Sequence, residues 1–159
     1  MAEIIQDIAD KYRIIAKEKG VSLNTVYSKD LPLVYADIAL IDRALQNIID
    51  NAIAHCKKGD VVTLELSRED QEVKITISDT GCGISPENLA KVRDPFFTTK
   101  AVGTGTGLGL SIVEQIAAAH GGELLIESEL GKGSAFTIVL PIAGTASATE
   151  HPPADLARE

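Results

Sequence analysis

The stretch Asp79-Thr80-Gly81-Cys82-Gly83-Ile84 decides the fold. In residues 73–78 before it, apolar and polar side chains alternate, as they do in a strand with one buried side. Asp79 continues the apolar side, so its carboxylate points toward the core, where burial costs free energy unless a donor meets it. The exocyclic amine of adenine is such a donor, and glycines let the backbone approach a flat ring. The stretch predicts the base end of a nucleotide pocket; the alternative is an ordinary turn after a strand.

A second glycine-rich stretch, Gly103-Thr104-Gly105-Thr106-Gly107-Leu108-Gly109-Leu110, follows residues 85–102. Apolar positions recur at helical spacing in residues 108–117, so this run opens a helix. Free backbone N–H groups and the dipole at a helix N-terminus attract anions. The run is neither a Walker motif, since no Gly-Lys-Ser/Thr follows, nor a dinucleotide fingerprint, since the segment before it does not resemble a strand. It predicts a phosphate-binding loop, and a flexible linker is the alternative.

A polar row accompanies the apolar stripe of a helix predicted over residues 37–57, which Asp37 can cap. Asn47, Asn51 and His55 follow one another at intervals of four residues and therefore share one side of that helix. Asparagine is unfavourable in a helix interior unless its amide is used, and an amide oxygen is a suitable ligand for Mg²⁺. The row predicts a metal site; solvated surface residues are the alternative.

Composition limits the classes of partner and compartment. The 159 residues are 45% hydrophobic, enough for one globular domain with its own core. A net charge of −8 argues against nucleic acid or direct contact with an anionic membrane. Cys56 and Cys82 lack metal-ligand spacing and are interpreted as free thiols in a reducing compartment. No apolar run approaches about 20 residues, so a cytoplasmic location is expected, including the cytoplasmic end of a membrane-bound sensor.

The order of elements predicts an α+β fold: a two-layer sandwich with a mixed, largely antiparallel sheet, helices on one face and a long lid. The ordered domain is expected over residues 1–142, with a disordered tail over 143–159 that lacks periodicity. The predicted helices cover 3–19, 37–57 and about 108–120, the predicted strands cover 21–27, 33–35, 61–67, 73–79, 123–128 and 134–140, and the lid covers 80–106.

The motifs occur together and in a fixed order. Asn47-x3-Asn51, Asp79-x-Gly81-x-Gly83 and the glycine run are accompanied by Asp94-Pro95-Phe96-Phe97-Thr98-Thr99-Lys100 and by Gly131-Lys132-Gly133-Ser134-Ala135-Phe136. The set resembles the ATP-binding catalytic domain of bacterial sensor histidine kinases, which belong to the Bergerat-fold (GHKL) superfamily. The resemblance covers about residues 3–141.

The resemblance implies a role for each motif. Asn51 would coordinate Mg²⁺ with help from Asn47, Asp79 would accept from the adenine amine, and Lys100 would reach the phosphates from the lid. Phe96 and Phe97 would anchor the lid or pack on the partner domain. The residues assigned to ATP in this way are Asn47, Asn51, His55, Asp79, Gly81, Gly83, Ile84, Lys100, Gly103, Thr104, Gly105, Thr106, Gly107, Leu108, Gly109 and Thr137.

Two places depart from the family pattern. The family often carries Lys and then Tyr three and four residues after the metal-binding asparagine, where this chain has Ala54 and His55. Either a phosphate cation and a ring over the base are missing, or His55 takes the place of the ring. Before Asp94 the family usually has an aromatic residue, and here it is Arg93.

Asn47 distinguishes a kinase from a hydrolytic ATPase. In the gyrase, HSP90 and mismatch-repair branch a water-activating glutamate stands four residues before the metal-binding asparagine, and an amide cannot take that proton. The resemblance therefore implies phosphoryl transfer to a histidine on a separate dimerisation domain, and onward to a response regulator receiver domain. His55, His120 and His151 lack the sequence setting of that acceptor. The alternatives are a serine kinase of the anti-sigma-factor type and a non-catalytic ATP-binding module.

Overall fold

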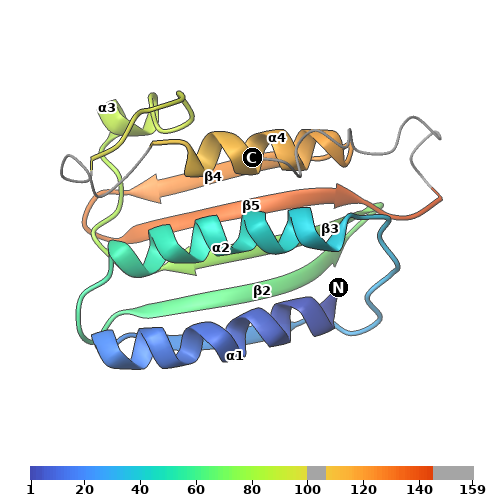
Figure 1. The fold of residues 1–159 in the computed structure, drawn as a ribbon, viewed down its shortest axis with the longest axis horizontal. Coiled ribbons are helices and arrows are strands. Elements are labelled where there is room, and N and C mark those ends of the chain that lie inside the picture. The colour runs from blue at the N-terminus through green and yellow to red at the C-terminus, as the bar shows by residue number, and fades with distance from the viewer. Residues whose placement is uncertain (100–106, 145–159) are drawn as a thin grey trace.

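A five-stranded sheet with helices packed on one face forms the fold (Figure 1). The computed structural model describes residues 1–99 and 107–144. The two layers confirm the predicted α+β sandwich. Its elements are α1 (Ala2–Lys19), β1 (Ser22–Tyr27), α2 (Ile38–Ala54), β2 (Val61–Glu69), β3 (Glu72–Asp79), α3 (Pro86–Leu89), α4 (Gly109–Ala119), β4 (Glu123–Glu129) and β5 (Gly133–Pro141).

The sheet is mixed and mainly antiparallel, with the strand order β1-β2-β3-β5-β4. Only β1 and β2 run parallel among the described strands, because α2 connects them as a crossover. Asp79 ends the central strand β3, where it pairs with Val62 of β2 and with Ser134 of β5. The carboxylate predicted to bind the base therefore lies at the end of the central strand, with a neighbouring strand on each side.

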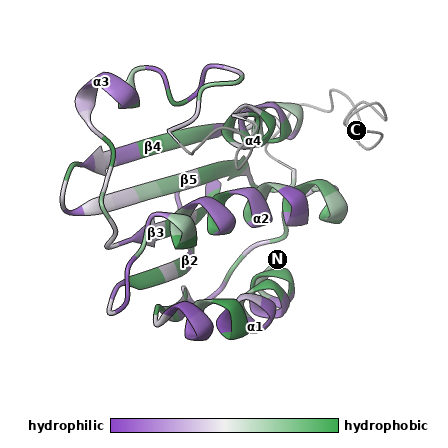
Figure 2. Ribbon diagram, turned by 60° about the vertical axis from the view of Figure 1, so that its left-hand side comes forward, coloured by the Kyte–Doolittle hydropathy of each residue, from purple (hydrophilic) through white to green (hydrophobic). Residues whose placement is uncertain are grey.

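Apolar side chains from both layers meet between the sheet and the helices. Ile75 and Ile77 of β3 are fully buried, as the alternation in the sequence predicts. Ile41, Leu45 and Ile48 of α2 cover them from the helix side. Figure 2 shows further apolar residues along α4 and along the middle of β4 and β5.

Side chains form hydrogen bonds with backbone groups at both ends of helix α2. At its start, Asp37 Oδ1 accepts from the N–H groups of Ala39 at 2.9 Å and Leu40 at 3.2 Å. The predicted end near residue 57 was wrong, since the helix ends at Ala54. Lys19 Nζ of α1 donates to the last two carbonyls, those of Ile53 (2.5 Å) and Ala54 (3.2 Å). The Ile53 carbonyl also accepts from Cys56 N–H at 3.2 Å.

Two other predictions about elements need correction. The predicted strand over 33–35 is absent from the described residues; Leu33 accepts a single backbone bond from Ala143, which does not make a ladder. The predicted lid contains the short helix α3, capped by Ser85 Oγ, which accepts from Asn88 N–H at 3.3 Å. The proposed tail overlaps residues 145–159, which lie outside the described part.

Among the helices of residues 1–99 and 107–144, none is both long enough and apolar enough to cross a membrane.

Candidate functional site

Asp79 is a buried carboxylate at the end of the central strand. It is 8% exposed and shares the helix-facing side of β3 with Ile75 and Ile77, which confirms the direction predicted for it. Burial raises its pKa above the ordinary value, while hydrogen bonding to Gly81 N–H (2.9 Å) and the nearby His55 act in the opposite direction. A carboxylate has more acceptor positions than this N–H fills, so Asp79 can accept from a ligand.

Gly81 and Gly83 pack against the protein backbone. A Cβ on Gly81 would lie 2.5 Å from the carbonyl oxygen of His55 and 2.9 Å from Asp79 Oδ1. Gly83 has a φ of +69°, and its Cβ would lie 2.1 Å from the carbonyl oxygen of Glu129. Both glycines were predicted to allow close approach of a ring. In the structure they also allow the loop after Asp79 to pack between the end of α2 and the β4–β5 turn.

Gly81→Ala is expected to weaken nucleotide binding by about tenfold or more, because the added methyl must displace the His55 carbonyl or the Asp79 carboxylate. Overpacking of this kind costs about 1–3 kcal/mol of stability. Gly59→Ala is the matched control: Gly59 has a φ of +96° and no atom within 4 Å of its would-be Cβ, so it adds backbone strain of about 1 kcal/mol away from the site. Calorimetric titration with Mg-ATP and urea unfolding measure both effects; equal affinity of the two variants would contradict this role of Gly81.

The predicted polar row lies on α2 beside the N-terminus of α4. Asn47, Asn51 and His55 are all partly buried, and His55 Nδ1 donates to the carbonyl oxygen of Asn51 at 2.7 Å. Within the described residues, Asn47 Nδ2 is the one buried side-chain polar atom without a hydrogen-bond partner. An unsatisfied buried donor costs about 1–3 kcal/mol, so this amide is suited to a bound polar ligand.

The glycine run opens a helix, as its pattern predicts. Helix α4 begins at Gly109 after the N-cap Leu108, and a Cβ on Gly109 would lie 4.0 Å from Asn47 Cβ. Gly107 has a φ of +70°, and its carbonyl oxygen accepts from Phe96 N–H at 2.9 Å. The predicted phosphate ligands Lys100, Gly103, Thr104, Gly105 and Thr106 lie outside the described residues and stay predictions.

An ion pair connects the lid to α4 at the position where the sequence departs from the family pattern. Arg93 Nη1 lies 3.0 Å from Glu114 Oε1 on α4. The two side chains are 40% and 44% exposed, so solvent limits the contribution of the pair to about 1 kcal/mol or less. Phe96 of the same segment is 73% exposed. The polar contact thus provides an anchor where the family usually has an aromatic one.

Thr137 is not brought together with the other predicted residues. Its Oγ1 is hydrogen bonded to Thr76 Oγ1 at 2.9 Å, and strand alternation puts both on the face of the sheet away from the helices. Ser134 occupies the helix-facing position opposite Asp79. Ser134 is not among the site residues predicted from the sequence. Residues two positions apart on a strand share a face, so Ser134 and Thr137, three positions apart, lie on opposite faces.

Ile84 joins the site through a chain of hydroxyl groups. Its N–H donates to Ser128 Oγ at 2.8 Å, and Ser128 Oγ lies 2.9 Å from Ser134 Oγ. Ser128 Oγ also donates to the carbonyl oxygen of Gly133 at 3.0 Å. These contacts fix the loop after Asp79 to the β4–β5 hairpin.

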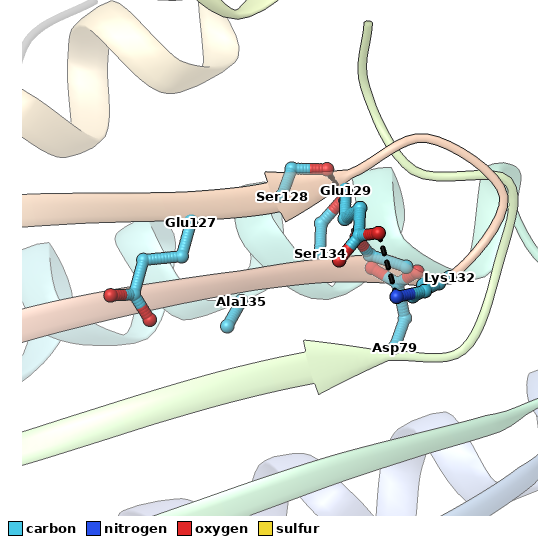
Figure 3. Close-up of a pocket in the computed structure, with 8 residues that line it drawn as sticks. Asp79, Glu127, Ser128, Glu129, Lys132, Ser134 and Ala135 are labelled. Carbon is cyan, nitrogen blue, oxygen red and sulfur yellow. Dashed lines mark hydrogen bonds and ion pairs between the residues drawn. The ribbon is translucent and has the colours of Figure 1, made fainter. Parts of the chain in front are cut away.

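A shallow depression of about 360 Å³ lies at the β4–β5 turn (Figure 3). Its lining includes Asp79 together with Glu127, Ala135 and the ion-paired Glu129 and Lys132 (2.7 Å). The register puts Glu127 and Ala135 on the sheet face away from the helices. None of the described residues of α2 or α4 lines it, so the depression does not coincide with the helix-side site around Asp79, Asn47 and Asn51.

Comparison with known proteins places these features in a family. Residues 36–144 match the family described as "Histidine kinase-, DNA gyrase B-, and HSP90-like ATPase". Sensor protein SrrB of Staphylococcus aureus is 39% identical over 145 residues, which are 89% of this chain and 25% of SrrB. The chain therefore spans about a quarter of the length of the curated relatives it matches.

Solved structures share this fold, and histidine kinases are among them. The catalytic domain of histidine kinase ThkA superposes with a TM-score of 0.79 at 26% identity, covering 89% of this chain and 92% of that one. Full-length ShkA in complex with AMPPNP superposes with a TM-score of 0.80 at 32% identity, covering 91% of this chain and 30% of ShkA. Both similarities extend over nearly all of the chain described above.

Proposed function

Because the chain belongs to the histidine kinase-, DNA gyrase B- and HSP90-like ATPase family, we propose that it is the ATP-binding catalytic domain of a two-component sensor histidine kinase. It positions Mg-ATP for phosphoryl transfer to a histidine on a separate dimerisation domain. The observation that carries this proposal is the buried Asp79, which ends the inner strand beside the polar row of α2. The structure of ShkA with AMPPNP, a nucleotide analogue, supports ATP as the ligand.

Asp79 selects the base in this proposal. Its carboxylate accepts from the exocyclic amine of adenine, while Gly81 N–H holds it in place. Guanine presents a carbonyl oxygen at the corresponding position, and two acceptors facing each other in a buried site repel. The arrangement therefore discriminates ATP from GTP.

Asn51, with Asn47 beside it, would hold Mg²⁺. No group of three or more His, Cys, Asp or Glu side chains gathers into a metal site in residues 1–99 and 107–144, so amide and phosphate oxygens are the ligands that fit. The partnerless atom of Asn47 is its Nδ2, a donor, which agrees with a phosphate oxygen at this place and not with the metal itself. When bound, the ion would neutralise charge on the phosphates, and the N-terminus of α4 adds backbone N–H groups directed at them.

The chain's own residues favour transfer to another domain over hydrolysis. Asn47 cannot serve as a general base for water. His55 Nδ1 donates to Asn51 O, and His120 accepts from Asp37 N–H at 3.0 Å while its Nδ1 donates to Ile116 O at 2.7 Å. Both histidines therefore have structural roles at helix ends, which agrees with an acceptor outside this chain. His151 lies outside the described residues.

Incubation with γ-labelled ATP is expected to leave the isolated chain unlabelled. Addition of a histidine-containing dimerisation domain from a matching kinase should give label on that histidine, and a receiver domain should then take the label onto an aspartate. Stoichiometric label on His55, His120 or His151 would contradict the proposal. Label on a serine of a supplied protein would favour the anti-sigma-factor type of kinase, and binding without any transfer would favour a non-catalytic module.

A further inference from the structure

The two cysteines of the chain, which are far apart in sequence, come together at the base end of the site. Cys82 N–H donates to the carbonyl oxygen of His55 at 3.3 Å, and Cys56 directly follows His55. Standard backbone dimensions across this bond put the two Cα atoms at most about 7 Å apart, and disulfides commonly span about 4.4–6.8 Å between Cα atoms. The backbone separation therefore permits a direct bond between the two side chains once the loop that carries Cys82 shifts.

The two thiols have different surroundings. Cys56 is 3% exposed and belongs to the core, whereas Cys82 is exposed, and both are free. Burial first, and then the carboxylates of Asp79 and Asp60, raise the pKa of Cys56 to about 11. The Cys82 thiol acts on Cys56 in the same direction, which agrees with the short backbone distance. An oxidant from solution therefore reacts first with Cys82.

We propose that Cys56 and Cys82 form a redox-sensitive thiol pair, which a disulfide oxidant of the glutathione class converts to an intramolecular disulfide that weakens nucleotide binding. The effect on binding rests on the proposed function; the formation of the bond does not. Intracellular disulfides of this kind are usually transient and regulatory.

The reaction is ordinary thiol–disulfide exchange. The Cys82 thiolate attacks one sulfur of oxidised glutathione, forms a mixed disulfide and releases one glutathione thiolate. Cys56 then loses its proton to solvent and attacks the Cys82 sulfur, which releases the second glutathione thiolate. Two protein thiols are oxidised by two electrons in total, and one glutathione disulfide is reduced to two thiols.

The bond would act on the loop that presents Asp79. Cys82 lies between Gly81 and Gly83 in this loop. The loop is already tightly packed at Gly81, where an added methyl group would lie 2.5 Å from the carbonyl oxygen of His55 and 2.9 Å from Asp79 Oδ1. Drawing the exposed Cys82 side chain toward the buried Cys56 requires this loop to shift. The position of the Asp79 carboxylate then changes, because Gly81 N–H holds it.

The experiment uses the whole chain, first reduced and then incubated with oxidised glutathione. Intact mass and non-reducing peptide mapping detect the bond, and calorimetry measures the Kd for Mg-ATP before oxidation, after it and after dithiothreitol. On oxidation the wild type is expected to lose about 2 Da, since two hydrogen atoms leave, and to give a disulfide-linked Cys56–Cys82 peptide. Its Kd for Mg-ATP should rise about tenfold and return to the starting value after dithiothreitol. Cys82→Ser and Cys56→Ser should show no internal bond and a ratio of oxidised to reduced Kd near one. Since Cys56 is buried, the exposed Cys82→Ser is decisive if Cys56→Ser folds poorly.

Glutathione retained on Cys82 without a bond to Cys56 would overturn the proposal, and so would a bond that leaves the Kd unchanged. Absence of ATP binding by the reduced wild type would instead refute the proposed function, and the mass and peptide map would still report the disulfide.

Discussion

Replacing Asp79 with asparagine is expected to weaken Mg-ATP binding about ten- to hundredfold. A hydrogen bond to a buried charged group contributes roughly 1.5–3 kcal/mol, and about 1.4 kcal/mol corresponds to one factor of ten. The substitution keeps the side-chain volume but replaces an acceptor with an amide that can turn its donor toward the adenine amine. Calorimetric titration with ATP and with GTP measures the effect, which should fall on ATP and reduce the discrimination between the two.

The same variant, Asp79→Asn, provides its own control for folding. Burial raises the pKa of Asp79 in the folded chain above the ordinary pKa of 3.8 that applies to the unfolded chain. As the pH rises from 3.8 through the raised pKa, ionisation of Asp79 therefore lowers the stability of the folded chain. The introduced amide does not ionise, so the variant should gain stability relative to the wild type across that interval and be at least as stable at neutral pH, as measured by urea unfolding. A stable variant that still discriminates ATP from GTP like the wild type would contradict the role of Asp79.

Asn51→Ala is expected to abolish Mg²⁺-dependent ATP binding, with a loss of affinity of at least about a hundredfold, because a metal ligand contributes several kcal/mol of charge stabilisation. Alanine is the best helix former, so α2 should remain intact. Titration with ATP in the presence of Mg²⁺ and in EDTA measures the effect: the variant should bind equally weakly in both, whereas the wild type should bind tightly only with the metal.

Asn24→Ala is the matched control for Asn51→Ala. Asn24 is exposed on β1, at the edge of the sheet away from α4, and its replacement should leave the Kd unchanged. Wild-type affinity in Asn51→Ala would remove the metal assignment from this residue. Equal losses in both variants would show that general destabilisation, and not a missing ligand, causes the effect.

Local patterns were sufficient to predict most of the fold. The alternation in residues 73–78 predicted β3 and the buried direction of Asp79, and Asp37 predicted the start of α2. The early end of α2 could not be predicted, because it depends on Lys19 of α1 and on Cys82 N–H, which reach His55 and its neighbours only in the folded chain. The segment 33–35 resembles a strand locally but has no partner strand among the described residues.

The motifs predicted which residues form the site, and tertiary structure supplied their surroundings. Asn47 and Asn51 share one helix, so their alignment follows from spacing alone. The contact between Arg93 and Glu114, the packing of Gly81 on His55 and the approach of Cys82 to Cys56 all join separate elements. Thr137 shows a different limit: the resemblance assigned it to ATP, but the alternation of its strand puts its side chain on the face of the sheet away from the helices.

A crystal structure of the chain with Mg²⁺ and AMPPNP tests the central claim most directly. The account predicts the adenine amine within hydrogen-bond distance of the Asp79 carboxylate and the metal bound by the side-chain oxygen of Asn51. A nucleotide bound in the depression at the β4–β5 turn, or a metal without contact to α2, would contradict it.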